Sequence, residues 1–134
     1  MSRDREIVFI SSGYDMCIRF WSNFNSNSQC KYQIDYKDNA INALEMTPNK
    51  EYVAFAAGNS IKFIDLKQGT PSLLLSIESH EGLVSNILIP DNFDNCFISA
   101  GEDSTIRIND IRQQKGVKSF THGNYVNSVA IGNH

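Results

Sequence analysis

The chain has 134 residues, which is enough for one ordinary domain. Its hydrophobic content of 41% and charged content of 20% are typical of a soluble globular protein. The net charge of −3 argues against a nucleic-acid partner, and the longest apolar runs are far shorter than the ~20 residues that a membrane span needs.

Short segments rich in Ile, Val, Phe and Tyr follow one another along the whole chain. Many alternate apolar with polar residues, as half-buried strands do, and turn signals such as "TPNKE", "KQGTP", "PDNFDN" and "GEDS" separate them. No stretch keeps a 3.6-residue apolar period over three turns, so we predict an all-β protein. The predicted strands are, in chain order, residues 6–11, 17–21, 30–36, 41–46, 52–57, 60–66, 73–77, 84–89, 96–100, 105–110, 117–121 and 126–131.

The sequence repeats itself. "SSGYDMCIRFWS" at residues 11–22 and "SAGEDSTIRIND" at residues 99–110 share one skeleton, and a weaker copy, "AAGNSIKFIDL", lies between them. The anchor residues Trp21, Ile64 and Asn109 lie 43 and 45 residues apart. A period of ~40–45 residues with four strands per unit is typical of WD40-type propeller blades, whereas helical solenoids lack the strand content.

We therefore predict an incomplete WD40-type β-propeller with about three blades of antiparallel four-stranded sheets. The single domain, residues 1–134, divides into blade 1 at about 6–35, blade 2 at about 36–78, blade 3 at about 79–121 and the start of blade 4 at about 122–134. A propeller ring holds ~4–8 blades, so we expect an N-terminal fragment, a truncated gene product or one half of an assembly.

The open ends of such a part-ring would expose apolar surface and unpaired strand edges. We therefore expect the isolated chain to be marginally stable or to self-associate. A monodisperse monomer that unfolds cooperatively would contradict this expectation.

The stretches "SGYDMCIRFW", "INALEMTPNKEYVAFAAGNSIKFIDL" and "AGEDSTIRINDIR" resemble the first three blades of the WD40-repeat subunits of TOR kinase complexes, the G-protein-beta-subunit-like family. The resemblance covers roughly residues 6–131. It implies a non-catalytic scaffold that binds and stabilises a TOR-type kinase through the C-terminal lobe of the kinase domain. The implied partners are this kinase and other complex subunits, with a role in nutrient and growth signalling and with no cofactor.

In that family a His, a Ser, an Asp and a Trp side chain form a hydrogen-bond chain that braces each blade. The resemblance gives this structural role to Ser11, Asp15, Trp21, His80, Ser99 and Asp103. Asn109 stands where the family would have Trp, and we expect the smaller side chain to weaken the packing of the third blade. Loss of a large buried aromatic costs ~3–5 kcal/mol unless neighbours refill the space.

Propellers present loops on two rims, where scaffolded folds tend to bind partners. In the family, rim loops of the early blades help dock the subunit on the kinase, and the corresponding stretch here is "KDNAIN". The predicted protein-binding residues are Asp38, Ala40 and Asn42, with Tyr14 and Glu102 in the turns of the repeated phrase as further candidates. The alternative is that these are ordinary solvated loop residues.

Catalysis and metal binding have weaker support. Ser11, His80 and Asp103 are the residue types of a catalytic triad, but Ser and Asp recur at matching places of the repeat, and a protein needs a triad only once. The three histidines and three cysteines show no metal-ligand spacing. A generic WD40 interaction scaffold or a non-functional truncated fragment is the alternative function, and a hydrolase is more remote. We predict no enzyme activity, metal or cofactor.

The chain is predicted to be cytoplasmic. Its first residues, "MSRDREIVFISS", lack the long apolar stretch of a signal peptide. An odd number of cysteines without a CxxC pair favours reduced thiols, as in the cytosol.

Overall fold

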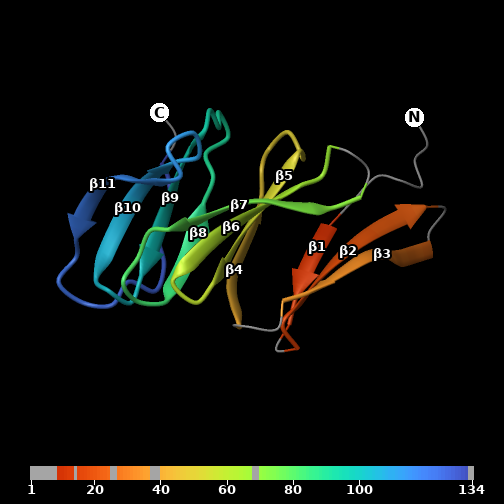
Figure 1. The fold of residues 1–134 in the computed structure, drawn as a ribbon, viewed down its shortest axis with the longest axis horizontal. Helices are drawn as coiled ribbons and strands as arrows, with labels where there is room; N and C mark the ends of the chain where they lie inside the picture. The colour runs from red at the N-terminus through yellow and green to blue at the C-terminus, as the bar shows by residue number, and fades with distance from the viewer. Residues whose placement is uncertain (1–8, 14, 25–26, 37–39, 68–69, 133–134) are drawn as a thin grey trace.

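A computed structural model of the chain describes residues 9–13, 15–24, 27–36, 40–67 and 70–132. These residues form eleven strands and no helix, and the strands make three antiparallel sheets (Figure 1). The all-β prediction is confirmed.

Each sheet is a meander of consecutive strands. Sheet 1 consists of β1 (Phe9–Ser12), β2 (Cys17–Phe24) and β3 (Asn27–Asp35). Sheet 2 consists of β4 (Ile41–Met46), β5 (Tyr52–Ala57), β6 (Ser60–Asp65) and β7 (Ser72–Glu78). Sheet 3 consists of β8 (Val84–Leu88), β9 (Cys96–Gly101), β10 (Thr105–Asp110) and β11 (Lys115–Thr121).

The three sheets succeed one another, with sheet 1 at one end, sheet 2 in the middle and sheet 3 at the other end (Figure 1). This arrangement is that of an incomplete WD40-type propeller, as predicted from the period of the sequence. Sheets 2 and 3 have four strands each, whereas sheet 1 has three among the described residues. The exact blade boundaries stay a prediction.

Sheet 2 lies between two hydrophobic cores, because β5 supplies side chains to both of them. Val53, Phe55 and Ala57 point to one side and pack with Ile18 and Phe20 of β2. The alternate residues of β5 point to the other side and pack with three buried residues of sheet 3, Val84, Ile87 and Phe97. The near-continuous apolar run "YVAFAA" follows from this double burial, since every position of the strand faces a core.

One predicted strand is wrong. Residues 126–131 carry the alternating pattern of a strand, but no strand is formed between residues 122 and 132. A strand needs a neighbour for its backbone groups, and apart from the Val126 N–H, which donates to the Gly101 carbonyl at 3.2 Å, no described strand pairs with this segment. The other eleven predicted strands overlap β1 to β11, with residues 6–8 of the first lying outside the described residues.

Candidate functional site

The two matching phrases of the sequence fold into the same turn. Between β1 and β2, the Asp15 carboxylate accepts the backbone N–H of Cys17 at 3.2 Å. Between β9 and β10, the Asp103 carboxylate accepts the backbone N–H of Thr105 at 3.1 Å. The residue after each aspartate has a positive φ angle, 64° and 68° respectively. Both aspartates therefore cap their own turns, which is a structural role.

In sheet 3 the repeated segment contributes to a hydrogen-bond network of five side chains. His80 precedes β8 and contacts Asp103 through Nδ1 at 3.0 Å and Ser99 through Nε2 at 2.7 Å. The Asn109 amide donates to Ser99 Oγ at 2.9 Å and accepts from Ser79 Oγ at 2.5 Å. Ser79, His80, Ser99 and Asn109 are all buried. A buried polar network stabilises a fold only when its members are satisfied, and here each has a partner.

One arrangement of protons gives every side chain of this network a hydrogen-bond partner. Because Ser99 Oγ accepts the amide of Asn109, its own hydroxyl can donate to Nε2 of His80. The Nδ1–H of His80 then donates to the Asp103 carboxylate. This assignment follows from the hydrogen-bond pattern and makes His80 a neutral imidazole in the folded chain.

Burial lowers the pKa of His80 below its ordinary value of 6.5, and the hydrogen bond with Asp103 offsets only part of this effect. Burial acts in the opposite direction on the pKa of Asp103. Hydrogen bonds from Thr105 and His80, together with one backbone N–H, nevertheless hold that pKa well below 3.8. The Arg107 guanidinium lies 3.8 Å from the same carboxylate. Near pH 7 the network therefore pairs a neutral imidazole with an ionised carboxylate.

Ser99, His80 and Asp103 contact one another in the order of a catalytic triad, yet Ser99 is 0% exposed. Its Oγ is already engaged by both His80 and Asn109. A nucleophile has to reach a substrate in an open site, and this one is closed. Ser11, the serine weighed as a triad residue from the sequence, bonds Trp21 in sheet 1 instead. The geometry supports bracing of the sheet.

Sheet 1 contains a shorter version of the same hydrogen-bond network. The Trp21 indole N–H donates to Ser11 Oγ at 2.9 Å, which repeats the link between the corresponding residues of sheet 3. The Trp21 ring stacks on Phe9 with the ring centroids 5.8 Å apart. Asp15 has Arg19 as its partner at 2.6 Å, and this hydrogen bond lowers the pKa of the Asp15 carboxyl. No described side chain takes the place of the histidine here.

Sheet 2 has apolar residues in place of the hydrogen-bonding side chains of the other two sheets. The pairing of β5 with β6 puts Phe55 at the serine position and Ile64 at the tryptophan position. Both side chains are buried in the core between sheets 1 and 2. The Tyr36 ring packs edge-on against Phe55, with the ring centroids 5.3 Å apart. The serine and the tryptophan have thus been exchanged together for apolar residues.

Ser79 is the network residue that the sequence analysis missed. No motif marks it, because the family pattern begins with the histidine that follows it. Two signals were available: a small polar residue directly before His80, and Gly116 opposite Asn109 in the pairing of β10 with β11. A β-carbon at Gly116 would lie 3.2 Å from Ser79 Oγ, so the glycine leaves room for the serine.

The starts of β4 and β8 and the β1–β2 and β9–β10 turns meet at one rim, because neighbouring strands run antiparallel. Ala40 and Asn42, both exposed, lie at this rim at the start of β4. Glu102 is also exposed and lies in the β9–β10 turn. Tyr14 and Asp38 are outside the described residues. A cavity of about 250 Å³ on the rim is lined by Ser12, Gly13, Ala40, Ile41 and Asn42.

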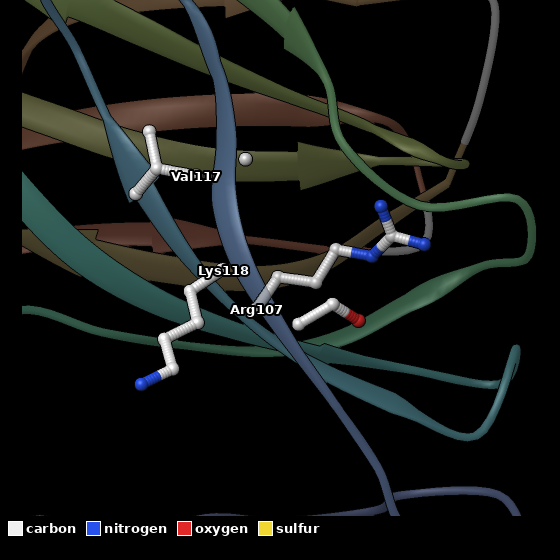
Figure 2. Close-up of a pocket in the computed structure, with 5 residues that line it drawn as sticks. Arg107, Val117 and Lys118 are labelled. Atoms are coloured by element: carbon white, nitrogen blue, oxygen red, sulfur yellow. The ribbon is translucent and has the colours of Figure 1, made fainter.

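A second cavity, of about 160 Å³, lies beside β10 and β11 (Figure 2). Two of its residues, Arg107 and Lys118, are cations and would favour an anion, but Figure 2 shows their side chains diverging. Arg107 lies 3.8 Å from Asp103, and the Lys118 ammonium lies 5.2 Å from the centre of the Phe120 ring. These partners leave no convergent pair of charges for a phosphate.

The part of the chain that the structure describes contains no group of three or more His, Cys, Asp or Glu residues placed to hold a metal ion. It also contains no helix of the length and apolar character required to cross a membrane.

Comparison with known proteins points in one direction. The target of rapamycin complex subunit LST8 of Saccharomyces cerevisiae is 29% identical over 125 residues, which are 93% of this chain and 40% of that protein. LST8-1 of Arabidopsis thaliana matches at 29% over the same shares, and wat1 of Schizosaccharomyces pombe at 27% over 93% of this chain and 39% of its own length. The chain resembles these TOR complex subunits along most of its length. No protein-family model matches it.

The chain spans about 40% of the length of these curated relatives. The similarity thus covers all three sheets of this structure but less than half of each relative. It agrees with the predicted resemblance to the WD40 subunits of TOR complexes.

Proposed function

We propose that this chain is a non-catalytic WD40 scaffold that binds a TOR-type kinase and stabilises it within a cytoplasmic TOR complex. The observation that carries the proposal is the similarity to TOR complex subunits over 93% of the chain, combined with the three propeller sheets. The polar network of sheet 3 supports a scaffold, since its serine is closed to substrates and its members hold one another in place.

The proposed docking surface is the rim that carries Ala40, Asn42 and Glu102. It has a hollow of about 250 Å³ between the β1–β2 turn and the start of β4. Two large apolar side chains, Leu83 and Tyr125, are exposed at 46% and 65% in the loops of the same rim. Exposed aromatic and apolar side chains that share one surface are typical of protein interfaces. The occupant we propose is the C-terminal lobe of the kinase domain.

The test is co-purification of the tagged chain with the TOR kinase of its native cell. Asn42→Arg places a long cation at the hollow and is expected to reduce the recovered kinase at least ~10-fold, as loss of a central contact does. Gln113→Arg is the matched control, because this exposed residue lies in the β10–β11 turn on the opposite rim. It should leave recovery unchanged.

Absence of the kinase from the purified unsubstituted chain would contradict the proposal. Equal loss with both variants would contradict the proposed docking surface, because the effect would then not depend on the rim. Mass spectrometry of the co-purified proteins identifies the kinase and separates it from chaperones.

A further inference from the structure

A third cavity lies between sheets 1 and 2 and shares no lining residue with the cavity on the rim. Its volume is about 310 Å³. The residues that line this side cavity are all apolar or aromatic: Ile34, Tyr36, Phe55, Ile64, Pro71 and Leu73. An apolar cavity of ~150 Å³ is enough to bind benzene, so the side cavity has room for a leucine or phenylalanine side chain.

The side cavity opens between two outer strands. Ile34 belongs to β3, the outer strand of sheet 1, and Leu73 belongs to β7, the outer strand of sheet 2. Phe55 and Ile64 are 0% and 1% exposed and lie at its inner end, whereas Leu73 is 55% exposed. Every residue that lines it belongs to sheets 1 and 2 or directly adjoins their strands. The cavity is therefore a feature of these two sheets.

The strand that borders the side cavity differs from the other two outer strands. Residues 72–77 of β7 include no charged residue, and two consecutive leucines, Leu73 and Leu74, are exposed at 55% and 48%. By contrast, β3 contains Lys31 and β11 contains Lys118. Lysines on an outer strand discourage contact with other chains. The exposed leucines of β7 lack this protection, as is typical of a surface that a partner covers.

A cation lies beside the side cavity. The Lys62 ammonium lies 5.3 Å from the centre of the Tyr36 ring, which lines the cavity, and donates to Ser76 Oγ at 3.0 Å. Lys62 and Ile64 lie on the same face of β6, because alternate residues of a strand do. Within the described part of the chain, no carboxylate forms an ion pair with Lys62. A negative charge is the complement of this position.

We infer that the side cavity is a docking site for an extended segment of a partner protein, in which an apolar residue and an acidic residue are two positions apart. The apolar side chain fills the cavity, and the carboxylate pairs with Lys62. Residues two apart in an extended segment point to the same side, and their spacing matches that of Ile64 and Lys62 on β6. This inference does not depend on the binding of a kinase.

The first experiment selects peptides from a random library of linear peptides displayed on phage, with the purified chain immobilised. We expect enrichment of peptides that carry an apolar residue and, two positions away, Asp or Glu. Fluorescence anisotropy then measures the affinity of a synthetic peptide with the enriched sequence. Leu73→Asp places a like charge at the outer side of the cavity and should weaken this peptide at least ~10-fold.

Val117→Asp is the matched control for this variant. It introduces the same charge at an apolar residue of β11 that is 46% exposed, close to the exposure of Leu73. Because Val117 lies in sheet 3, away from the side cavity, the affinity for the peptide should stay unchanged. Circular dichroism checks that both variants keep their strands.

The second experiment exchanges charges between the chain and the peptide. Lys62→Glu should weaken the acidic peptide about 5-fold and should strengthen a second peptide, in which lysine replaces the acidic residue, by a similar factor. Lys62→Gln removes the charge and should bind the two peptides equally. A variant that fails to fold would lose both peptides, so a reciprocal change in preference reports on the charge itself.

No enrichment, or enrichment of peptides without an acidic residue, would overturn the inference. Equal losses with Leu73→Asp and Val117→Asp would overturn it as well, and so would an unchanged preference in Lys62→Glu. Light scattering of the unsubstituted chain and of Leu73→Asp tests another occupant. A dimer that becomes a monomer in Leu73→Asp would show that a second copy covers the cavity in place of a partner segment.

Discussion

Sheets 1 and 3 begin from the same phrase and differ in its largest residue. In sheet 1 the half-buried Trp21 reaches Ser11 with its indole N–H. In sheet 3 the fully buried Asn109 reaches Ser99 with its amide, at the same 2.9 Å. The donor is therefore retained although the aromatic ring is not. What the position requires is an N–H aimed at the serine.

The smaller side chain of Asn109 leaves space that a second polar side chain uses. Ser79 occupies part of it and donates to the amide oxygen of Asn109, an acceptor that an indole lacks. The packing lost with the ring is thus offset by one more buried hydrogen bond.

Sheet 2 shows a third solution, in which the donor and the acceptor disappear together. Phe55 and Ile64 occupy the positions of the serine and the tryptophan, and both are buried. Replacing both partners of a buried hydrogen bond by apolar groups is close to neutral for stability. Replacing only one partner leaves the other buried without a hydrogen bond. The three sheets therefore differ in side chains, but at these two positions none of them leaves a buried donor without an acceptor.

The largest loss of stability is expected when the polar side chain of one sheet is placed among the apolar residues of another. Ile64→Asn places an amide at a position where Phe55 offers no acceptor. Loss of the apolar side chain and burial of an unpaired amide should together cost about 4 kcal/mol of the free energy of unfolding. Urea unfolding followed by the fluorescence of Trp21, the single tryptophan, measures it.

Ile64→Val is the control for this measurement and should cost only about 1 kcal/mol. A loss below about 2 kcal/mol for Ile64→Asn would mean that water or a rearranged neighbour satisfies the amide. The rule drawn from the three sheets would then fail.

A smaller loss of stability is expected for the two serines, and it should be greater for Ser99 than for Ser11. Ser99→Ala removes a buried hydroxyl with two partners, leaving His80 Nε2 and the Asn109 amide unsatisfied, and should cost about 2–3 kcal/mol. Ser11→Ala removes one bond to a half-buried indole that water can replace, and should cost about 1 kcal/mol or less. Equal losses in the same urea experiment would show that the extended network of sheet 3 adds nothing to the single link of sheet 1.

The sequence predicts most of this fold because the signals for strands and turns are local. Alternation and turn residues mark eleven strands, and the 40–45-residue period groups them into sheets. Residues 126–131 carry the same local signal and form no strand, because pairing depends on a neighbour that a pattern cannot supply.

The network could be predicted only in part. His80, Ser99 and Asp103 follow from the family pattern, and the structure brings them together. The compensation for Asn109 could not be predicted, because it depends on Ser79, thirty residues away, and on space left by a glycine of β11. Such contacts are fixed by packing between elements and leave no trace in the spacing of a motif.

The smallest predicted effect is one of pH and belongs to sheet 3 alone. The lowered pKa of His80 means that the folded chain binds fewer protons than the unfolded chain between the two pKa values. Stability should therefore be complete above pH 6.5 and should fall as the pH decreases below it, by at most about 1.4 kcal/mol per pH unit. The lowered pKa of Asp103 adds a second loss, which begins as the pH falls through 3.8.

Urea midpoints measured from pH 8 to pH 3 separate these two steps. His80→Gln should remove the loss between pH 7 and pH 5, while a loss below pH 4 remains with the carboxylates. The exposed His122 is the matched control, and His122→Gln should leave the profile unchanged. A loss near pH 6 that persists in His80→Gln would assign the titration to another group.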